Sequence, residues 1–323
     1  MPLSQGVAKI QYSAMSALFR ITTKNIFYQH EDLFGSQRVV DELVDDIAVT
    51  LDLDRSDLNI VATAKGVVAG PLIIWLRDGQ SVDASSGDVG VMIPPSDSIQ
   101  GVELGAIRWI LVLEKDATFR SLSASRYWQR CLWGDGLLIT AKGYPDMITR
   151  SFLHSLSGRR PDVPVFVLVD FDPHGLNIFH CFLHGSGNVL TDSAIRNGSM
   201  RFLGIKSRHL FSINVANPAS LARVGAPAER QASTSPSGAT AAMSAEHAQV
   251  TTSVLDTGDR KLICHTLNRL SPSHAADSTC ATLVQELQVM QMLGYKAEIQ
   301  ALGDGGNLEK WLDAHIGEEL HAL

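Results

Sequence analysis

The sequence lacks the features that most directly place a protein in a membrane or outside the cell. No apolar run approaches the ~18 residues that a membrane-spanning helix needs, and the N-terminal segment lacks the continuous apolar core of a signal peptide. The four cysteines are scattered and form no C-x-x-C pair, so neither a zinc site nor a disulfide framework is predicted. We therefore expect an intracellular protein in a reducing compartment, with no membrane partner.

An excess of positive charge is also missing. The formal net charge is −7, whereas proteins that bind nucleic acids often carry basic patches. This balance argues mildly against a nucleic-acid partner. It does not exclude one, because a locally basic groove or bound metal ions can override an acidic average.

The sequence does contain enough apolar residues for a packed core. Of its 323 residues, 45% are hydrophobic and 19% are charged, and this length allows roughly two domains. The stretch "SQRVVDELVDDIAVTLDL" has apolar residues at helical spacing, and two β segments flank an expected turn at Lys65-Gly66. Helices followed by a hairpin predict a winged-helix domain over residues 1–80.

Strand and helix patterns alternate in the rest of the chain. The Ser/Gly/Pro-rich residues 81–105 are expected to form a linker. From residue 106 to residue 323, near-continuous apolar strands alternate with amphipathic helices, which predicts a mixed α/β domain with a buried parallel sheet. Within it, residues 216–254 are rich in Ala and Ser and are expected to form a flexible insertion, and residues 282–302 and 307–323 are expected to be C-terminal helices.

Three carboxylates mark the ends of two predicted strands. The strand "VPVFVLVDFD" ends in Asp170 and Asp172, which share a face because side chains two apart on a strand point the same way, and "WILVLE" ends in Glu114. Neighbouring parallel strands would bring all three acids to one edge, where oxygen ligands suit Mg²⁺ and phosphoryl transfer. Acids at strand ends are also often solvated, or cap the next helix as Asp172 could. The pattern alone leaves the two interpretations about even.

Two further residues have the types that phosphoryl transfer uses. The loop "AKGYPDMITRSFL" precedes a helix whose first turns hold Arg150, and a helix N-terminus beside an arginine can bind phosphate, although an ordinary turn with a surface arginine is at least as common. Tyr28, in "TTKNIFYQHEDLF", can act as a nucleophile if a cation or base assists its phenol. Most tyrosines in such aromatic stretches belong to a core or an interface instead. His174, next to the acids, is expected at the rim of a site rather than among metal ligands.

The chain resembles the A subunit of topoisomerase VI in a series of motifs that occur in order: "TTKNIFYQHEDLFGSQ", "AKGVVAG", "WILVLEKDATF", "GYPDMITRSFL", "LVDFDPHGLNIF", "SMRFLGI" and "GYKAEIQAL". The resemblance is closer to the eukaryotic meiotic relatives of that subunit, the transesterases that make double-strand breaks to start recombination. It covers nearly the whole chain apart from the Ala/Ser-rich insertion.

The resemblance implies a fold and a set of roles. The family has an N-terminal winged-helix domain with a catalytic tyrosine, at the position of Tyr28. Its second domain is a Toprim fold that binds Mg²⁺ through a glutamate and a D-x-D pair, at the positions of Glu114, Asp170 and Asp172. In the family, the tyrosine of one subunit works with the metal site of its dimer partner, and its attack on a DNA phosphodiester joins the protein to the 5′ end. Two copies acting on opposite strands give the double-strand break.

The resemblance also implies partners and a location. We expect Lys24, Lys65 and Arg150 to contact phosphates of double-stranded DNA, in a homodimer. A B-type topoisomerase-like subunit, with which the reaction is ATP-dependent, or accessory meiotic break proteins are expected as further partners. The expected location is the nucleus, on chromosomes.

Two departures from the family support the first of two alternative functions. The Arg-Asp that precedes the tyrosine in the family is Lys24-Asn25 here, and lysine keeps the charge without the bidentate fork of arginine. The chain begins 27 residues before Tyr28, so we expect its start to be either truncated or that of a shorter isoform. One alternative is a catalytically weak homologue that binds DNA or assembles the break machinery. Another is a Toprim nuclease or primase-like enzyme that never uses Tyr28.

Overall fold

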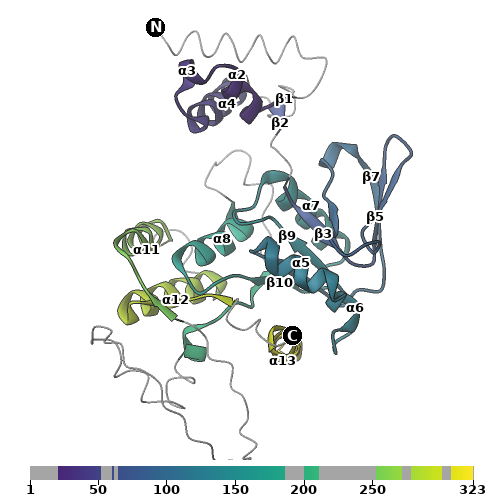
Figure 1. Ribbon diagram of the computed structural model, residues 1–323, viewed down its shortest axis with the longest axis vertical. Coiled ribbons are helices and arrows are strands. Elements are labelled where there is room, and N and C mark those ends of the chain that lie inside the picture. Colours follow the sequence, from purple (N-terminus) through teal and green to yellow (C-terminus); the bar gives the residue numbers. More distant parts are fainter. Residues whose placement is uncertain are drawn as a thin grey trace, which may run out of the picture. The chain divides into compact units, whose positions relative to one another are not determined.

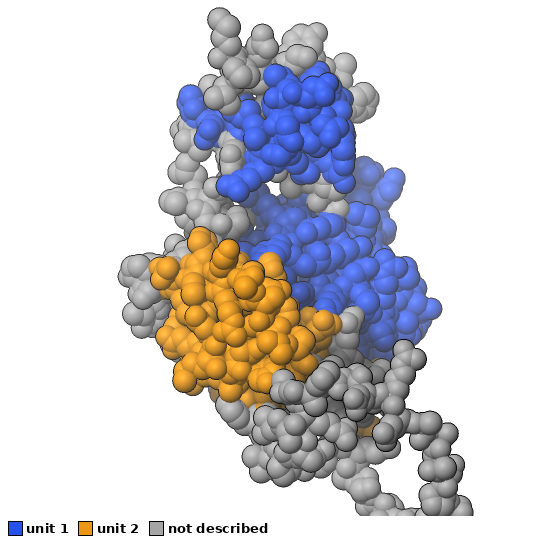
Figure 2. All heavy atoms as spheres, turned by 60° about the vertical axis from the view of Figure 1, so that its left-hand side comes forward, with its two compact units in different colours: residues 1–166, 178–201 blue, residues 167–177, 202–323 orange. Residues whose placement is uncertain are grey.

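The computed structural model describes residues 21–51, 60–61, 65–185, 200–210, 252–270, 278–299 and 307–322. The chain divides into two compact units, residues 1–166 with 178–201 and residues 167–177 with 202–323 (Figure 2). The boundary between the units passes through strand β10 (Val165–Leu168). None of the described helices combines the length and the apolar character that crossing a membrane requires.

The N-terminal helices form a small cluster with its own core. Strand β1 (Ile21–Thr22) pairs in parallel with β2 (Ile60–Val61) and is followed by α2 (Thr23–Gln29), α3 (Glu31–Phe34) and α4 (Gln37–Leu51), drawn in purple in Figure 1. The predicted helix is confirmed as α4, because its apolar residues recur on one face and pack against the helices before it. The buried residues of this core are Ile26, Phe34, Val40, Val44 and Ile47.

The hairpin expected around Lys65-Gly66 does not form among the described residues. Strand β2 pairs with β1, whereas β3 (Val67–Ala69) pairs antiparallel with both β6 (Val91–Met92) and β9 (Gly136–Thr140). Gly66 serves a close contact rather than a turn, since a Cβ built there would lie 2.2 Å from Oγ1 of Thr149. The winged-helix domain therefore stays a prediction.

The central sheet confirms the mixed α/β fold. Its strand order is β11-β10-β8-β9-β3-β6, where β8 is Trp109–Leu113 and β11 is Met200–Phe202. β8 and β9 run in parallel, whereas β3 is antiparallel to its neighbours. Every residue of β8, β9 and β10 is buried, as near-continuous apolar strands predict. The expected helices between these strands are α5 (Asp116–Ala124), α6 (Tyr127–Arg130) and α7 (Met147–Arg159).

The stretch expected as a linker, residues 81–105, carries regular structure. It holds β5 (Ser81–Asp83), β6, the short 3₁₀ helix η1 (Ser96–Ser98) and β7 (Ile99–Leu104). Strand β4 (Leu72–Leu76) is central in an antiparallel sheet of order β5-β4-β7. The Ser, Gly and Pro residues that suggested a linker form the turns between these short strands, which have the same composition as a linker.

In the second unit a short strand replaces part of a predicted helix. Strand β12 (Thr252–Val254) pairs antiparallel with β13 (Tyr295–Ala297), and α11 (Thr257–Leu270) packs with α12 (Ser278–Leu293). The helix predicted over residues 282–302 is wrong at residues 294–299, because Gly294 adopts φ 73° and ends it, and residues 300–302 lie outside the described part of the chain. Of the predicted insertion, residues 216–251 lie outside the described residues, and its last three residues form β12.

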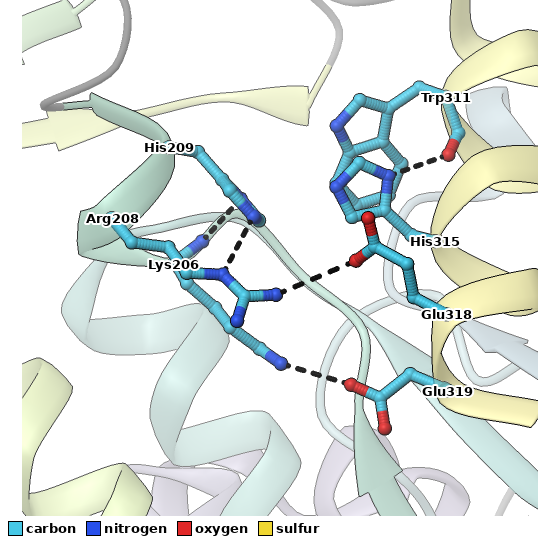
Figure 3. Close-up of polar contacts among 7 residues, drawn as sticks. All are labelled: Lys206, Arg208, His209, Trp311, His315, Glu318 and Glu319. Carbon is cyan, nitrogen blue, oxygen red and sulfur yellow. Dashed lines mark hydrogen bonds and ion pairs between the residues drawn. The ribbon is translucent and has the colours of Figure 1, made fainter. Parts of the chain in front are cut away.

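The last helix, α13 (Asn307–His321), is joined to the segment after β11 by ion pairs and ring contacts. The ammonium of Lys206 lies 3.2 Å from Glu319, and the guanidinium of Arg208 lies 3.8 Å from Glu318. The ring of His209 meets those of Trp311 and His315 edge-on, with centroids 6.1 and 5.0 Å away. Figure 3 shows the seven residues of this contact: Lys206, Arg208, His209, Trp311, His315, Glu318 and Glu319.

Candidate functional site

Tyr28 lies on the surface of the N-terminal helical cluster. It is 63% exposed on α2. Its neighbour Phe27 packs against the core, and the centroids of the two rings are 5.5 Å apart. The ammonium of Lys24, one helical turn earlier, lies 5.9 Å from the centre of the Tyr28 ring. The core does not need this phenol for packing, and the cation of Lys24 lies beside it.

Glu114 directly follows β8 in the first unit and is partly exposed. Its carbonyl accepts a hydrogen bond of 2.9 Å from the backbone N–H of Gly143. Lys142 and Gly143 adopt φ 56° and 95°, and the ammonium of Lys142 lies 3.6 Å from Asp116. The loop that follows β9 is thereby held next to the carboxyl end of β8.

The same loop leads into α7 through a side-chain cap. Oδ1 of Asp146 accepts the N–H of Thr149 at 2.8 Å, and Oδ2 accepts the hydroxyl of Thr149 at 3.0 Å. The N–H of Lys65 also reaches Oδ2 of Asp146, at 3.4 Å. Two of the predicted phosphate contacts thus come from adjoining segments, because Lys65 lies against the cap and Arg150 follows Thr149.

Arg150 is not a surface residue. Only 3% of it is exposed, in the second turn of α7, although arginine is almost never fully buried unless it is paired. From the sequence alone, an ordinary turn with a surface arginine was at least as common an explanation as a phosphate site. The structure shows a buried arginine instead.

The two aspartates lie in the second unit, and each uses one carboxylate oxygen to hold backbone. Oδ1 of Asp170 accepts the N–H of Ile299 at 2.9 Å, and only 3% of Asp170 is exposed. Oδ1 of Asp172 accepts the N–H of Gly175 at 2.6 Å, which makes Asp172 the N-cap of α8 (Pro173–His184). Gly175 must be glycine there, since its Cβ would lie 2.4 Å from the carbonyl oxygen of Asp170. The capping role is confirmed, and it uses Oδ1 alone.

Strand β13 runs beside this pair. Phe171 and Ala297 exchange two backbone hydrogen bonds, both of 2.9 Å. Lys296, the residue before Ala297, has its ammonium 2.6 Å from Oδ2 of Asp259. Sequence reasoning missed both Lys296 and Asp259. The signal available in the sequence was Gly294, which ends the preceding helix, so that "YKA" can form a strand.

Charge around Lys296 affects the pKa of both partners. The hydrogen bond to Asp259, together with the charges of Asp259, Asp256 and Asp172, raises the pKa of Lys296 in spite of its burial. Burial raises the pKa of Asp259, but the hydrogen bonds from Lys296 and the Asp256 N–H, with the charges of Lys296 and His174, outweigh it and lower this pKa overall. Both groups are held in their charged forms.

The chemistry of the acids suits a hard cation, because carboxylate oxygens are ligands that Mg²⁺ prefers. Asp170 and Asp172 flank a single residue, and Oδ1 of each accepts a backbone N–H. Glu114 belongs to the other compact unit. Within the part of the chain that the structure describes, no three His, Cys, Asp or Glu side chains gather closely enough to hold a metal ion.

A pair of histidines was also missed. His180 and His184 stand four residues apart on α8, and their ring centroids are 5.1 Å apart. The spacing H-x-x-x-H was visible in the sequence. His180 is buried, with 6% exposed.

Two family models match segments of this chain. The model of the Toprim domain shared by Spo11 and the A subunit of topoisomerase 6 matches residues 109–237, and the model described as "Type IIB DNA topoisomerase" matches residues 6–60. The chain belongs to the family of Spo11 and the topoisomerase VI A subunit. The Toprim domain that the resemblance implied is confirmed; Glu114 and the two aspartates lie within its match, and Tyr28 lies within the other.

Similar proteins occur in fungi, animals and plants. The chain is 37% identical over 194 residues to "Meiotic recombination protein rec12" of Schizosaccharomyces pombe, covering 60% of this chain and 53% of that protein. It is 34% identical over 197 residues to "Meiotic recombination protein SPO11" of Homo sapiens (60% and 48%). To the A subunit of DNA topoisomerase 6 from Arabidopsis thaliana it is 36% identical over 194 residues (59% and 44%). The chain spans about half the length of these curated relatives.

Proposed function

We propose that this chain is the tyrosine-bearing subunit of an enzyme that cleaves double-stranded DNA to start meiotic recombination. The family and the names of the relatives from Schizosaccharomyces pombe and Homo sapiens support this proposal. The observation that carries it is the position of Tyr28. Its side chain is 63% exposed on α2, with the ammonium of Lys24 beside its ring. The core of the helical cluster does not include this phenol.

The proposed reaction is a transesterification. Oη of Tyr28 attacks the phosphorus of a DNA phosphodiester, loses its proton to solvent and forms a new O–P bond. The bond from phosphorus to the 3′ oxygen breaks, and that oxygen leaves as a hydroxyl after taking up a proton. The protein then remains joined to the 5′ phosphate. Lys24, whose ammonium lies 5.9 Å from the centre of the Tyr28 ring, would stabilise the negative charge that develops in the transition state.

Glu114, Asp170 and Asp172 would hold Mg²⁺, which when bound neutralises negative charge on the phosphate. Lys24 and Lys65 contact the DNA backbone directly in this proposal. Arg150, with 3% exposed, adds a buried positive charge near the start of α7. Such contacts do not read bases, so DNA binding should depend strongly on salt.

The proposed assembly follows the family. Two copies of the chain act on opposite strands, and the tyrosine of one copy serves the metal-binding residues of the other. A B-type subunit, which would bring the ATP dependence, or accessory break proteins complete the enzyme. Its place is the nucleus, on meiotic chromosomes.

Replacement of Tyr28 tests this function. With a B-type partner, Mg²⁺ and plasmid DNA, the wild type should yield protein covalently attached to DNA 5′ ends, and Tyr28→Phe should yield none. Tyr127→Phe, which removes the hydroxyl of a buried tyrosine on α6, is the control and should keep the adducts.

Two other outcomes favour the alternatives. DNA cutting that survives in Tyr28→Phe without adducts would mean a Toprim nuclease. If the wild type forms no adduct although its partners are present, the chain is a DNA-binding or scaffold homologue, as the Lys24-Asn25 departure from the family suggests.

A further inference from the structure

The D-x-D pair has a built-in positive charge beside it. We propose that Lys296, held by Asp259, is the resident counter-ion of Asp172: it neutralises and positions this carboxylate in the metal-free protein and opposes a divalent cation that binds there. The inference rests on the proposed function in so far as it takes Asp170 and Asp172 as metal ligands.

Backbone pairing places Lys296 opposite Asp172. Phe171 and Ala297 form an antiparallel bridge and exchange both of their backbone hydrogen bonds. In an antiparallel pair, the residue after one partner faces the residue before the other, so Asp172 faces Lys296. Such neighbouring positions are the non-hydrogen-bonded kind, in which the side chains come closest.

The same pairing determines which face of the strands carries the charged side chains. Asp170 lies two residues before Asp172 and therefore on the same face. By the same rule, Glu298 lies on the face of Lys296, opposite Asp170. The ammonium of Lys296 is thus the one cation among four charged side chains that the bridge brings to this face of the described strands.

Lys296 is held in place by a partner that is itself fixed. Its ammonium is 2.6 Å from Oδ2 of Asp259, which is only 6% exposed. Asp259 is fixed by a reciprocal cap at the start of α11: it accepts the N–H of Asp256 at 3.0 Å, and Asp256 accepts the N–H of Asp259 at 2.8 Å. The lysine therefore does not swing freely in solvent, and its charge stays beside the bridge. The raised pKa of Lys296, caused first by its bond to Asp259 and further by charges that include Asp172, agrees with this placement.

The chemical need for such a charge follows from the pair itself. Two carboxylates that face the same way repel each other unless a cation lies nearby. Lys296 supplies that cation from the protein when no metal is bound. A divalent cation that takes Asp172 as a ligand must then bind against a fixed positive charge. A unit charge roughly 6 Å from a divalent cation, in a water-like dielectric, opposes it by about tenfold in affinity.

The first experiment measures the contact without metal. Removing Lys296 alone would leave Asp259 buried and unpaired, which destabilises by itself, so the background is Asp259→Asn, whose amide oxygen can still accept the Asp256 N–H. In that background, Lys296→Met, Asp172→Asn and the double change form a thermodynamic cycle read as Tm in EDTA. We expect the loss of Tm from Lys296→Met to shrink clearly when residue 172 is already Asn. Strictly additive losses would overturn the inference.

The second experiment measures the metal. Free Mn²⁺ is followed by its EPR signal in titrations of wild type, Lys296→Arg, Asp259→Asn and Lys296→Met/Asp259→Asn. The last variant should bind Mn²⁺ more tightly, by up to about tenfold, whereas Lys296→Arg should match the wild type. A lysine with a merely structural role would give weaker or unchanged binding in the double variant, and that result contradicts the proposal.

The two experiments separate this inference from the proposed function. If the wild type binds no Mn²⁺, the assignment of Asp170 and Asp172 as metal ligands fails, and coupling in the metal-free cycle still supports Lys296 as the counter-ion of Asp172. If Mn²⁺ binds but the cycle is additive, the metal ligands stand and the role of Lys296 is lost.

Discussion

Oδ1 of Asp170 accepts a hydrogen bond of 2.9 Å from the backbone N–H of Ile299, which lies 129 residues later in the chain. The carboxylate proposed as a metal ligand therefore also ties the end of β10 to the segment after β13. With 3% of Asp170 exposed, this bond is shielded from water. A substitution at Asp170 changes both structure and charge, and the two effects must be separated.

Asparagine and alanine at position 170 should separate them. Asp170→Asn keeps an oxygen that can accept the Ile299 N–H but removes the charge, so we expect a near-native Tm and loss of cleavage. Asp170→Ala leaves a buried donor without its acceptor, which should cost about 1–3 kcal/mol of unfolding free energy. Urea denaturation of the two variants and the covalent-adduct assay measure these effects. Equal stability of both variants would show that the bond to Ile299 contributes nothing.

Gly66 should tolerate no side chain. In Gly66→Ala the new Cβ would lie 2.2 Å from Oγ1 of Thr149 and 3.0 Å from Cδ1 of Ile93, and such overpacking typically costs about 1–3 kcal/mol. The loss should appear as a lower urea midpoint. Gly101→Ala is the matched control, because a Cβ there meets nothing within 4 Å.

A second-site change checks the cause. Thr149→Ala removes the hydroxyl that the new methyl group would meet, so Gly66→Ala/Thr149→Ala should lose less stability than the two single losses added together. The rescue is expected to be partial, because Ile93 remains close. If the two losses are additive, the contact with Thr149 is not the cause of the stability loss in Gly66→Ala.

The fold of the central sheet could be predicted because its signals are local. Apolar strands alternating with amphipathic helices are found as β8, β9, β10 and the helices between them. The sequence allowed two roles for Asp172. Its position before Pro173 indicated a helix cap, and its spacing from Asp170 indicated a metal ligand. The structure shows the cap. The role proposed for Tyr28 rests on family resemblance, because spacing alone does not indicate it.

Other features could not be predicted because they depend on distant partners. Gly66 looked like a turn residue, since nothing in its neighbourhood indicates that Thr149 packs against it. Lys296 lies in a stretch whose pattern predicts a helix, and only its pairing beside Phe171 and its contact with Asp259 make it notable. The Ser/Gly/Pro-rich residues 81–105 have the composition of a linker, but β4 provides the strand that orders them.

The cap of α7 should be worth more than an ordinary N-cap. Asp146 accepts the N–H and the hydroxyl of Thr149 and also the N–H of Lys65. Loss of a cap typically costs about 0.5–2 kcal/mol, and we expect Asp146→Ala to reach the upper part of this range. Asp146→Asn keeps one oxygen that can accept the Thr149 N–H but loses the second acceptor, so it should fall between wild type and alanine in urea denaturation. A cost for alanine no larger than that for asparagine would mean that these contacts contribute little.

The contact between His209 and α13 should weaken in acid. Burial, followed by the charges of His315, Arg208 and Lys206, lowers the pKa of His209 from 6.5 to about 4. The N–H of Lys206 faces Nδ1 and the Nε–H of Arg208 faces Nε2, both at 3.1 Å (Figure 3). A neutral ring offers one acceptor and a protonated ring offers none, so the folded protein disfavours the protonated form.

The direction of the pH effect follows from this lowered pKa. The unfolded chain takes up a proton near pH 6.5 and the folded chain only near pH 4, so the stability due to neutral His209 is present above pH 6.5 and is lost as the pH falls from 6.5 toward 4. Hydrogen exchange of the α13 amides should therefore accelerate, relative to its intrinsic rate, on going from pH 7 to pH 5. His209→Gln removes the titrating group and should flatten this dependence, whereas His321→Gln, at the exposed end of α13, should leave it unchanged. Equal pH dependence in His209→Gln and wild type would assign the effect to another group.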